Sequence, residues 1–448
     1  MQPAHNSFQR LHAIALAGAL LCLLGLLTTA TAAARKIAQI ETSGGIRAWL
    51  VEERSIPLVS LRFTFEGGAL QDPEGREGLT SMLASLLTEG AGALTAEDYA
   101  RRVADEGSQI SLSVGRDQIH GGLDALTKRF DASAELLRLA LAEPRLDAST
   151  IERVRQQKLA DLELAASEPR NVAFNRWYAT SFPGQRYGRP AEGTEASVQA
   201  ITAADLHAQQ RRLLARDGLR VVIVGDIGRE QAALILDRIF GGLPAKADLM
   251  PLQAPRLQVL PAPVVVEKEL PLATTAFGAA AVPGTHPDFP AWQVLAHIIG
   301  SGDFDATLME EIRVKRGLAY AVSISLINDR AAPILLGGMA TKTENMAAAL
   351  AVLKDVLART AAAGPSADRV EAAKRYLTGS YLLDFDTNAK LAGSLLRIWI
   401  EGRGPDFIAE RNLTISRVTT ADVKRVARSA LAWDGFNVTI VGKPQLAK

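Results

Sequence analysis

The sequence contains a single cysteine among its 448 residues, and this residue, Cys22, lies in an apolar N-terminal segment. Cleavage of that segment leaves a chain that can form no disulfide, offers no thiolate to a metal ion and has no cysteine nucleophile. The composition is therefore compatible with an oxidising compartment, and it excludes cysteine proteases and cysteine-ligated zinc sites.

An excess of charge of one sign is also missing. The chain has 50 lysines and arginines against 49 aspartates and glutamates. Surfaces that bind nucleic acid or anionic membranes need a clear basic excess, so we expect neither as a partner. A hydrophobic content of 48% and a charged content of 22% are typical of a soluble globular protein, and 448 residues suffice for two to four domains.

Long hydrophobic runs are scarce as well. The longest covers residues 13–27, AIALAGALLCLLGLL, and is shorter than the roughly 20 residues that a membrane-spanning helix needs. Arg10 precedes it, and small residues with two possible A-x-A cleavage sites follow it before Arg35. This order predicts a cleavable signal peptide over residues 1–34 and export to the periplasm. An uncleaved anchor is the alternative, and we expect no membrane span in the mature chain.

An internal duplication is the most informative feature that is present. VVIVGD at 221–226 returns in form as VTIVGK at 438–443, and ITAADL at 201–206 returns as VTTADV at 418–423. Both pairs are 217 residues apart. The mature chain therefore consists of two homologous halves, which we place at 35–245 and 264–448. Residues 246–263 contain four prolines and suit an extended linker.

Strand and helix patterns alternate within each half. VSLRFTFEGG at 59–68 alternates with period two, and residues 108–126 read as a hairpin around Gly115. Long helical patterns cover 75–90 and 147–167, and the second half repeats the order with strands at 272–280, 318–326 and 333–340. We expect an α+β fold in which each half is a mainly antiparallel sheet covered by helices.

Three stretches resemble the M16 (pitrilysin and insulinase) metallopeptidase family in its short bacterial form. They are VSLRFTFEGGALQDPEGREGLTSMLASLLTEGAG, SEPRNVAFNRWYATSFPGQRYGRPAEG and IIGSGDFDATLMEEIRVKRGLAYAVSIS. The third, with its KRGLAY core, is the most specific. The resemblance covers essentially the whole mature chain, and it implies that the two halves are arranged as a clamshell.

The family's zinc motif, H-x-x-E-H, is degenerate in this chain. Two histidines one helical turn apart hold the ion, and the glutamate between them acts as general base. The resemblance places these positions at Ser81, Ala84 and Ser85, and it places the third ligand, a carboxylate on a later helix, at Asp161. Hydroxyls are poor zinc ligands and alanine accepts no proton, so we expect neither metal nor cofactor in this chain.

A second set of family groups is retained. The resemblance implies an arginine and a tyrosine seven residues apart that contact the substrate, and Arg313 and Tyr320 have this spacing in RVKRGLAY. A guanidinium and a phenol can donate hydrogen bonds to the oxyanion of peptide hydrolysis. An arginine near a helix end and a tyrosine in a strand are also ordinary structural residues.

Two further segments have open interpretations. The glycines of IIGSGDF at 298–304 form no phosphate-binding motif, and they fit either a tight turn or the border of a substrate cleft. The strand around 108–114 is either an interior strand or an edge strand that pairs with a bound peptide.

We therefore expect a zinc-less M16-like subunit that is inactive alone and forms a heterodimer with a zinc-bearing M16 partner. The pair would be a periplasmic peptidase for short or unfolded peptides, with zinc, base and water from the partner. The alternative is a catalytically inert M16 fold that binds peptides or serves as a scaffold. An independent serine hydrolase has little support, because Ser81 and Ser85 have no histidine near them in sequence and no G-x-S-x-G motif is present.

Overall fold

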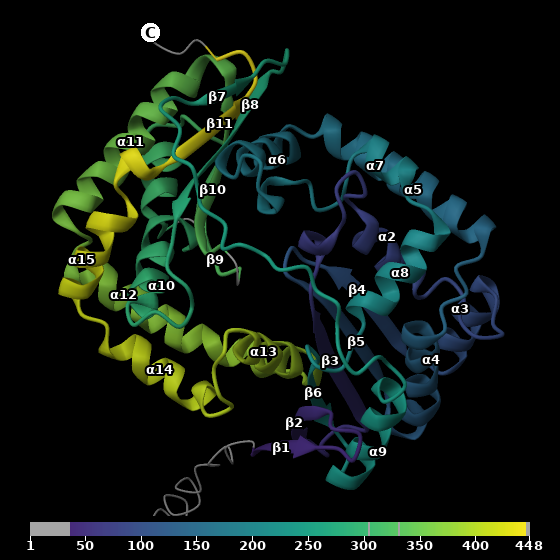
Figure 1. The fold of residues 1–448 in the computed structure, drawn as a ribbon. Coiled ribbons are helices and arrows are strands. Elements are labelled where there is room, and N and C mark those ends of the chain that lie inside the picture. The colour runs from purple at the N-terminus through teal and green to yellow at the C-terminus, as the bar shows by residue number, and fades with distance from the viewer. Residues whose placement is uncertain (1–35, 303–304, 330–331, 445–448) are drawn as a thin grey trace, which may run out of the picture. The chain divides into compact units, whose positions relative to one another are not determined.

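The computed structural model describes residues 36–302, 305–329 and 332–444, and Figure 1 shows their path. The expected signal peptide over residues 1–34 lies outside these ranges. Within them, no helix has the length and apolar character that crossing a membrane requires.

The first half builds a six-stranded sheet with the strand order β1-β2-β6-β3-β5-β4. Its strands are β1 Ile37–Glu41, β2 Arg47–Glu52, β3 Leu58–Glu66, β4 Gln109–Val114, β5 Gln118–Leu126 and β6 Arg220–Gly225. β3 is antiparallel to both of its neighbours, β5 and β6, whereas β2 and β6 are parallel. The expected hairpin is present as β4 and β5, and the Gly115 N–H closes its turn by donating to the Gln118 carbonyl at 2.8 Å.

The second half repeats this arrangement in a five-stranded sheet with the order β7-β11-β8-β10-β9. The strands are β7 Val264–Val266, β8 Leu272–Ala280, β9 Ala321–Ile327, β10 Ile334–Lys342 and β11 Asn437–Val441. Here β8 is antiparallel to β10 and β11, and β7 is parallel to β11. Strand for strand this is the order β2-β6-β3-β5-β4 of the first sheet. The expected α+β fold with two related halves is confirmed.

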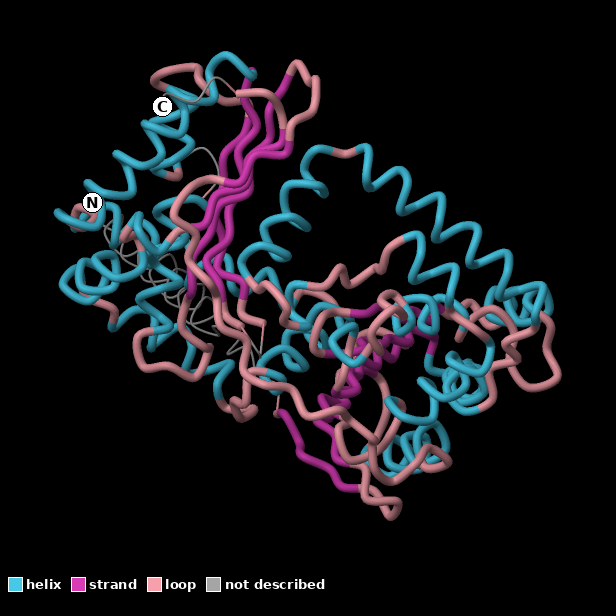
Figure 2. Tube along the Cα trace, turned by 45° about the horizontal axis from the view of Figure 1, so that its top comes forward, coloured by secondary structure: helices cyan, strands magenta, loops and turns pink. Residues whose placement is uncertain are grey.

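Helices flank the strands of each sheet (Figure 2). Those of the first half are α2 Leu79–Leu86, α3 Ala96–Asp105, α4 Phe130–Ala142, α5 Ala148–Ser167, α6 Pro169–Ser181, α7 Glu195–Ala200, α8 Ala203–Leu213 and α9 Arg229–Phe240. Those of the second half are α10 Phe289–Ala296, α11 Met346–Ala363, α12 Ala367–Ser380, α13 Asn388–Ile400, α14 Phe407–Arg417 and α15 Thr420–Ala430. The chain at His297–Ser301 and Met309–Val314 is π-helical, a wider winding than that of an α-helix.

The two halves exchange one helix each. α6 belongs to the first half by sequence but packs on β8 and β11 of the second sheet. α13 belongs to the second half but packs on β3 and β6 of the first sheet. The two helices hold corresponding places in the internal repeat, so the exchange is reciprocal, and residues 39–448 form one compact unit.

Trp177 fixes α6 on the second sheet. Its side chain is fully buried, and its indole N–H donates to the Asn437 carbonyl of β11 at 3.0 Å. A Cβ at Gly278 of β8 would lie 2.8 Å from this ring, so the absence of a side chain there makes room for it. In the reverse direction, the Asn388 amide at the start of α13 donates to the Leu58 carbonyl of β3 at 3.1 Å.

A buried carboxylate fixes the start of α2, the helix that carries the degenerate motif. Its N-cap residue, Gly78, has no side chain to cap the helix. Asp72 takes this role and accepts hydrogen bonds from the Gly78 and Thr80 N–H groups at 2.9 Å each, from the Thr80 hydroxyl and from Gln209 Nε2 at 3.3 Å. Burial raises the pKa of Asp72 from 3.8 to about 6, although these donors favour the ionised form.

Two glycines let the loop before α7 approach α2 closely. Gly78 has φ +90°, and a Cβ there would lie 2.5 Å from the Glu192 carbonyl oxygen. Gly193 has φ +87°, and a Cβ there would lie 2.2 Å from the Glu77 carbonyl oxygen. Positive φ and missing space both require glycine at these positions. The contact places the side chain of Glu192 beside the first turn of α2.

Replacement of Asp72 by alanine is expected to destabilise the protein by about 3 kcal/mol, because it leaves buried donors without an acceptor. Urea unfolding near neutral pH measures the loss. Asp161→Ala is the matched control, since Asp161 is exposed and should cost less than about 0.5 kcal/mol. Equal losses in the two variants would contradict the capping role of Asp72.

The raised pKa of Asp72 gives this residue a pH signature. Because the folded chain binds the proton more tightly than the unfolded chain, the resulting stabilisation is complete below pH 3.8 and is lost as the pH rises through about 6. In wild type, this contribution makes the unfolding free energy fall as the pH rises from 3.8 to about 6. Asp72→Ala has no such carboxyl group, so its unfolding free energy should not show this part of the fall. The measurement is urea unfolding at a series of pH values, and parallel curves for the two proteins would contradict it.

Replacement of Trp177 by alanine should lower the unfolding free energy by about 3–5 kcal/mol, because it empties the site where α6 meets the second sheet. Trp433→Ala is the control, since Trp433 is only partly buried at the edge of the second core. Urea midpoints of the two variants would be compared with wild type. A loss in Trp177→Ala no larger than that in the control would contradict the anchoring role.

Candidate functional site

The residues at the degenerate motif differ in exposure. Ser81 and Ala84 are buried on α2, whereas Ser85 is exposed, and its hydroxyl donates to the Ser81 carbonyl at 3.2 Å. Of the two hydroxyls that stand at the histidine positions, only that of Ser81 is directed into the structure. The first ligand position is therefore the one that has acquired a new set of partners.

Lys158 lies directly against Ser81. From α5, its Nζ donates to Ser81 Oγ at 2.7 Å and to Glu192 Oε2 at 2.7 Å. Ser81 Oγ in turn donates to Glu192 Oε2 at 2.6 Å. Burial by itself would raise the pKa of Glu192, but the hydrogen bonds from Lys158 and Ser81 hold it below its ordinary value. The three side chains form a closed triangle with one positive and one negative charge.

This arrangement does not fit a zinc ion. A zinc site needs three nitrogen, sulfur or oxygen ligands around a common point, and an ammonium group repels the cation. Asp161, the expected third ligand, is exposed and accepts a hydrogen bond from Gln157 Nε2 at 2.9 Å. Among the residues that the structure describes, no group of three His, Cys, Asp or Glu side chains could hold a metal ion.

The contact of Ser81 with Lys158 also resembles a serine–lysine pair, which some hydrolases use. A lysine that acts as a base must be neutral. Lys158 instead forms an ion pair with Glu192 at 2.7 Å, and its side chain is only 13% exposed. Because the Ser81 proton is already donated to Glu192, the geometry supports a structural role for this serine.

The retained pair lies on the surface of the second half. Arg313 is in the π-helical turn before β9, and its side chain is exposed. Tyr320 immediately precedes β9, its side chain is 55% exposed, and its N–H donates to the Ala340 carbonyl of β10 at 2.9 Å. The backbone thus fixes the base of Tyr320 while the phenol stays accessible.

Two cations close to Arg313 in sequence are held by carboxylates. Lys315 Nζ lies 2.6 Å from Glu311 and 2.8 Å from Glu310, and Arg316 lies 2.8 Å from Glu311. Hydrogen bonds from Lys315 and Arg316 lower the pKa of Glu311 to about 2. These exposed pairs add little stability, but they keep both basic side chains of KRGLAY directed at their own helix.

Each sheet has an outer strand beside one of these two sets of residues. β4 is the outer strand of the first sheet and contacts α2, and β9 is the outer strand of the second sheet. The strand around 108–114 is therefore an edge strand, and the interior alternative is wrong. Gly300 packs closely against β9. A Cβ at this position would lie 2.5 Å from the Ile324 nitrogen, so there is no room for a side chain. Residues 303–304 of the glycine stretch lie outside the described residues.

Sequence reasoning missed Lys158 and Glu192. Lys158 precedes the expected ligand Asp161 by one helical turn on α5, and Glu192 stands beside Gly193 in the PAEG motif. The motif does indicate a tight approach of backbone segments. Which side chains that approach brings to Ser81 could not be read from spacing alone, because it depends on how α5 crosses α2.

Comparisons with known proteins identify the family of this fold. Residues 48–195 match the family described as "Insulinase (Peptidase family M16)", and residues 200–377 match "Peptidase M16 inactive domain". A non-peptidase homolog, YmxG of Helicobacter pylori, is 26% identical over 340 residues, which are 75% of this chain and 78% of that protein. The mitochondrial-processing peptidase subunit beta of Lentinula edodes is 23% identical over 389 residues, 82% of each chain.

Solved structures show the same fold. A crystal structure of a peptidase M16 inactive domain from Pseudomonas fluorescens superposes with a TM-score of 0.86, at 23% identity, and covers 92% of this chain and 99% of that one. The fold, the two family matches and the altered motif on α2 lead to one assignment. The chain belongs to the M16 peptidase family, as a member without the family's zinc site.

Proposed function

We propose that this chain is the zinc-less subunit of a two-chain M16 peptidase. It pairs with a zinc-bearing M16 chain in the periplasm, and the pair cleaves short or unfolded peptides. Alone, it hydrolyses no peptide. The observation that carries this proposal is the contrast between the two halves: an ammonium group closes the α2 site, while Arg313 and Tyr320 stay exposed beside an edge strand.

The chemistry of the exposed pair suits a supporting role. The transition state of peptide hydrolysis carries negative charge on the former carbonyl oxygen, and a phenol or a guanidinium can donate hydrogen bonds to it. Edge strands such as β4 and β9 offer backbone N–H and C=O groups to an extended peptide. In this division of tasks the partner supplies zinc, general base and water, and this chain supplies substrate and transition-state contacts.

A similar relative supports assembly into a larger enzyme, because it is named as a subunit of a mitochondrial-processing peptidase. A second candidate function is a catalytically inert protein that binds peptides or serves as a scaffold. The similarity to YmxG, which is named a non-peptidase homolog, favours that reading. The two functions differ in one measurable respect, since only the first needs the Tyr320 hydroxyl.

Restoring the motif alone should not restore zinc binding. The triple variant Ser81→His, Ala84→Glu, Ser85→His still carries the Lys158 ammonium, which repels a divalent cation at the first ligand. Adding Lys158→Glu removes that charge and supplies a carboxylate, so the quadruple variant should bind about one zinc per chain. Metal content after dialysis against trace zinc measures this.

The control for that experiment is the triple variant with Lys354→Glu. Lys354 is exposed on α11 in the second half, so its replacement makes the same change of charge away from the site. It should bind no zinc. Stoichiometric zinc in the triple variant by itself would show that Lys158 does not close the site.

Peptidase activity should require both chains and the Tyr320 hydroxyl. Purification of the tagged chain from its own periplasm should retain an M16 chain with H-x-x-E-H, and the complex should cleave a fluorogenic peptide. Tyr320→Phe should lower kcat/KM of the complex about a hundredfold, because one oxyanion donor is lost. Tyr376→Phe is the matched control, since both tyrosines are 55% exposed, and it should leave kcat/KM unchanged.

Arg313→Gln should likewise reduce kcat/KM of the complex, and Arg211→Gln, an exposed arginine of α8, should not. Full activity in both Tyr320→Phe and Arg313→Gln would favour the scaffold function. Metal-dependent cleavage by the isolated chain would contradict both functions.

A further inference from the structure

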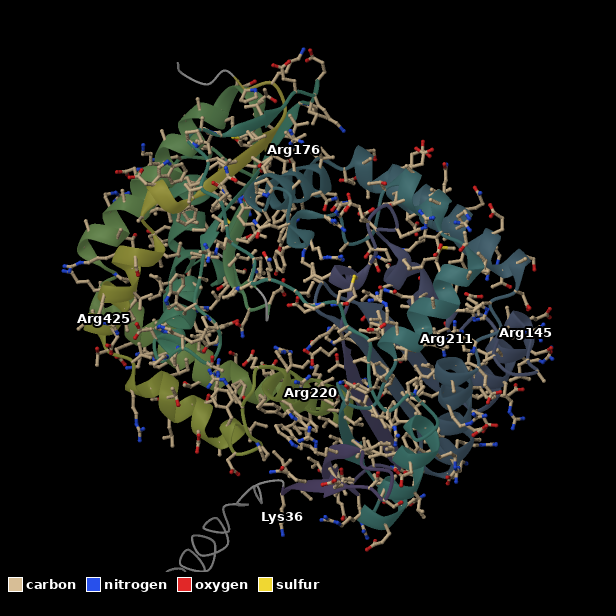
Figure 3. The ribbon with its side chains drawn as sticks, viewed as in Figure 1. Lys36, Arg145, Arg176, Arg211, Arg220 and Arg425 are labelled. Carbon is tan, nitrogen blue, oxygen red and sulfur yellow. The ribbon has the colours of Figure 1, made fainter. Side chains whose placement is uncertain are left out.

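A pocket lined by arginines lies where α13 meets the first sheet. Its volume is 610 Å³, within the range typical of small-molecule sites. The first half contributes Arg47 of β2, Arg220 of β6 and Arg229 of α9, and the second half contributes Arg403, which follows α13. Figure 3 shows Arg220 near α13. The peptide-contacting residues proposed above do not line this pocket.

Charge in this pocket is strongly unbalanced. Among the described residues that line it, four are arginines and one, Glu41, carries a carboxylate. The chain as a whole is close to neutral, with a net charge of +1, so the pocket concentrates positive charge locally. Guanidinium groups that share a pocket repel one another, and a multiply charged anion would relieve that repulsion.

The arginines are placed by regular structure. β2 and β6 are parallel with Ala48 opposite Val221, so Arg47 and Arg220 project from neighbouring points at the same end of the sheet. Arg229 is the first residue of α9, and its Nη2 donates to the Gln39 carbonyl at 3.2 Å. The three positive charges of the first half are therefore fixed by two strands and one helix.

Aromatic rings pack against Arg403, the fourth arginine, and form part of the pocket wall. The Arg403 guanidinium lies 4.0 Å above the ring of Phe407, and its Nε is 3.6 Å from a Glu401 carboxylate oxygen. Trp49 of β2 and Trp399 of α13 stack with ring centroids 4.8 Å apart and planes 2° from parallel. This stack joins the two halves, so the pocket is complete only when α13 is seated on the first sheet.

We propose that this pocket binds a phosphate-bearing anion such as a phosphate monoester or a diphosphate. Guanidinium forks match phosphate oxygens in geometry, and phosphate carries close to two negative charges near neutral pH, which suits a lining of four arginines of which Arg403 is also paired with Glu401. Gly402 and Gly404 form part of the wall, and a Cβ at Gly404 would meet nothing within 4 Å, which leaves open space beside the arginines. The phosphate belongs either to a soluble metabolite or to the headgroup of an anionic phospholipid.

The experiment measures binding of diphosphate and inorganic phosphate to the full chain by calorimetry at low ionic strength. Arg47→Ala and Arg229→Ala should each weaken diphosphate binding about tenfold, because each removes a charged hydrogen-bond donor. Both residues are exposed, so their truncation leaves the core intact. Arg211→Ala is the matched control, which removes the same charge from α8, outside the pocket, and should bind as wild type does.

A second variant tests the pocket by filling it. Gly404→Glu introduces a carboxylate at a position with open space, so it should abolish diphosphate binding while the melting temperature stays at or above the wild-type value. Vesicles of phosphatidylglycerol and of phosphatidylcholine distinguish the sources. Capture of the anionic vesicles that depends on Arg47 assigns the phosphate to a lipid, and diphosphate binding without such capture assigns it to a soluble compound.

Two results would overturn the proposal. One is the absence of binding by both diphosphate and anionic vesicles in the wild-type chain. The other is equal weakening by Arg47→Ala, Arg229→Ala and Arg211→Ala, which would show a general response to net charge rather than a site.

Discussion

The reciprocal exchange of α6 and α13 is the constraint on which the rest of the structure depends. Each helix leaves its own half and completes the covering of the other sheet, so neither half buries its apolar surface alone. The buried indole of Trp177 attaches α6 to the second sheet, and the Trp49–Trp399 stack attaches α13 to the first sheet. Because the duplicated halves hold each other in this way, residues of the two halves that are far apart in sequence lie together, both in the core and in the arginine-lined pocket.

Charge balance explains why the α2 site does not fit a metal ion and is nevertheless well packed. A metallopeptidase site gathers anionic and lone-pair ligands around a divalent cation. Here the ammonium of Lys158 supplies the positive charge, and Ser81 and Glu192 accept its hydrogen bonds. An internal cation with satisfied partners leaves no buried charge uncompensated, so the helix and the loop around it stay packed together. The site is stable for the same reason that it is closed to zinc.

In the second half, the basic residues of KRGLAY lie at the surface and are not enclosed. Its basic segment contains several cations, and Glu310 and Glu311 hold two of them in ion pairs on the surface. Arg313 and Tyr320 have exposed side chains next to the outer strand of the sheet. The molecule thus combines a first half whose chemical site is sealed with a second half whose donors are accessible.

The sequence by itself determined the duplication, the α+β alternation, the family and the loss of the zinc ligands, because each depends on residue identity at fixed spacing along the chain. Ser81, Ala84 and Ser85 cannot form a zinc motif whatever their surroundings. What replaced the metal was decided only by the tertiary structure, since Lys158 and Glu192 reach Ser81 from a crossing helix and a loop whose positions no local pattern encodes. The helix exchange and the grouping of Arg47 with Arg403 were likewise decided by packing. Local periodicity predicts which face of a helix is apolar, but it does not say which of two similar sheets that face will cover.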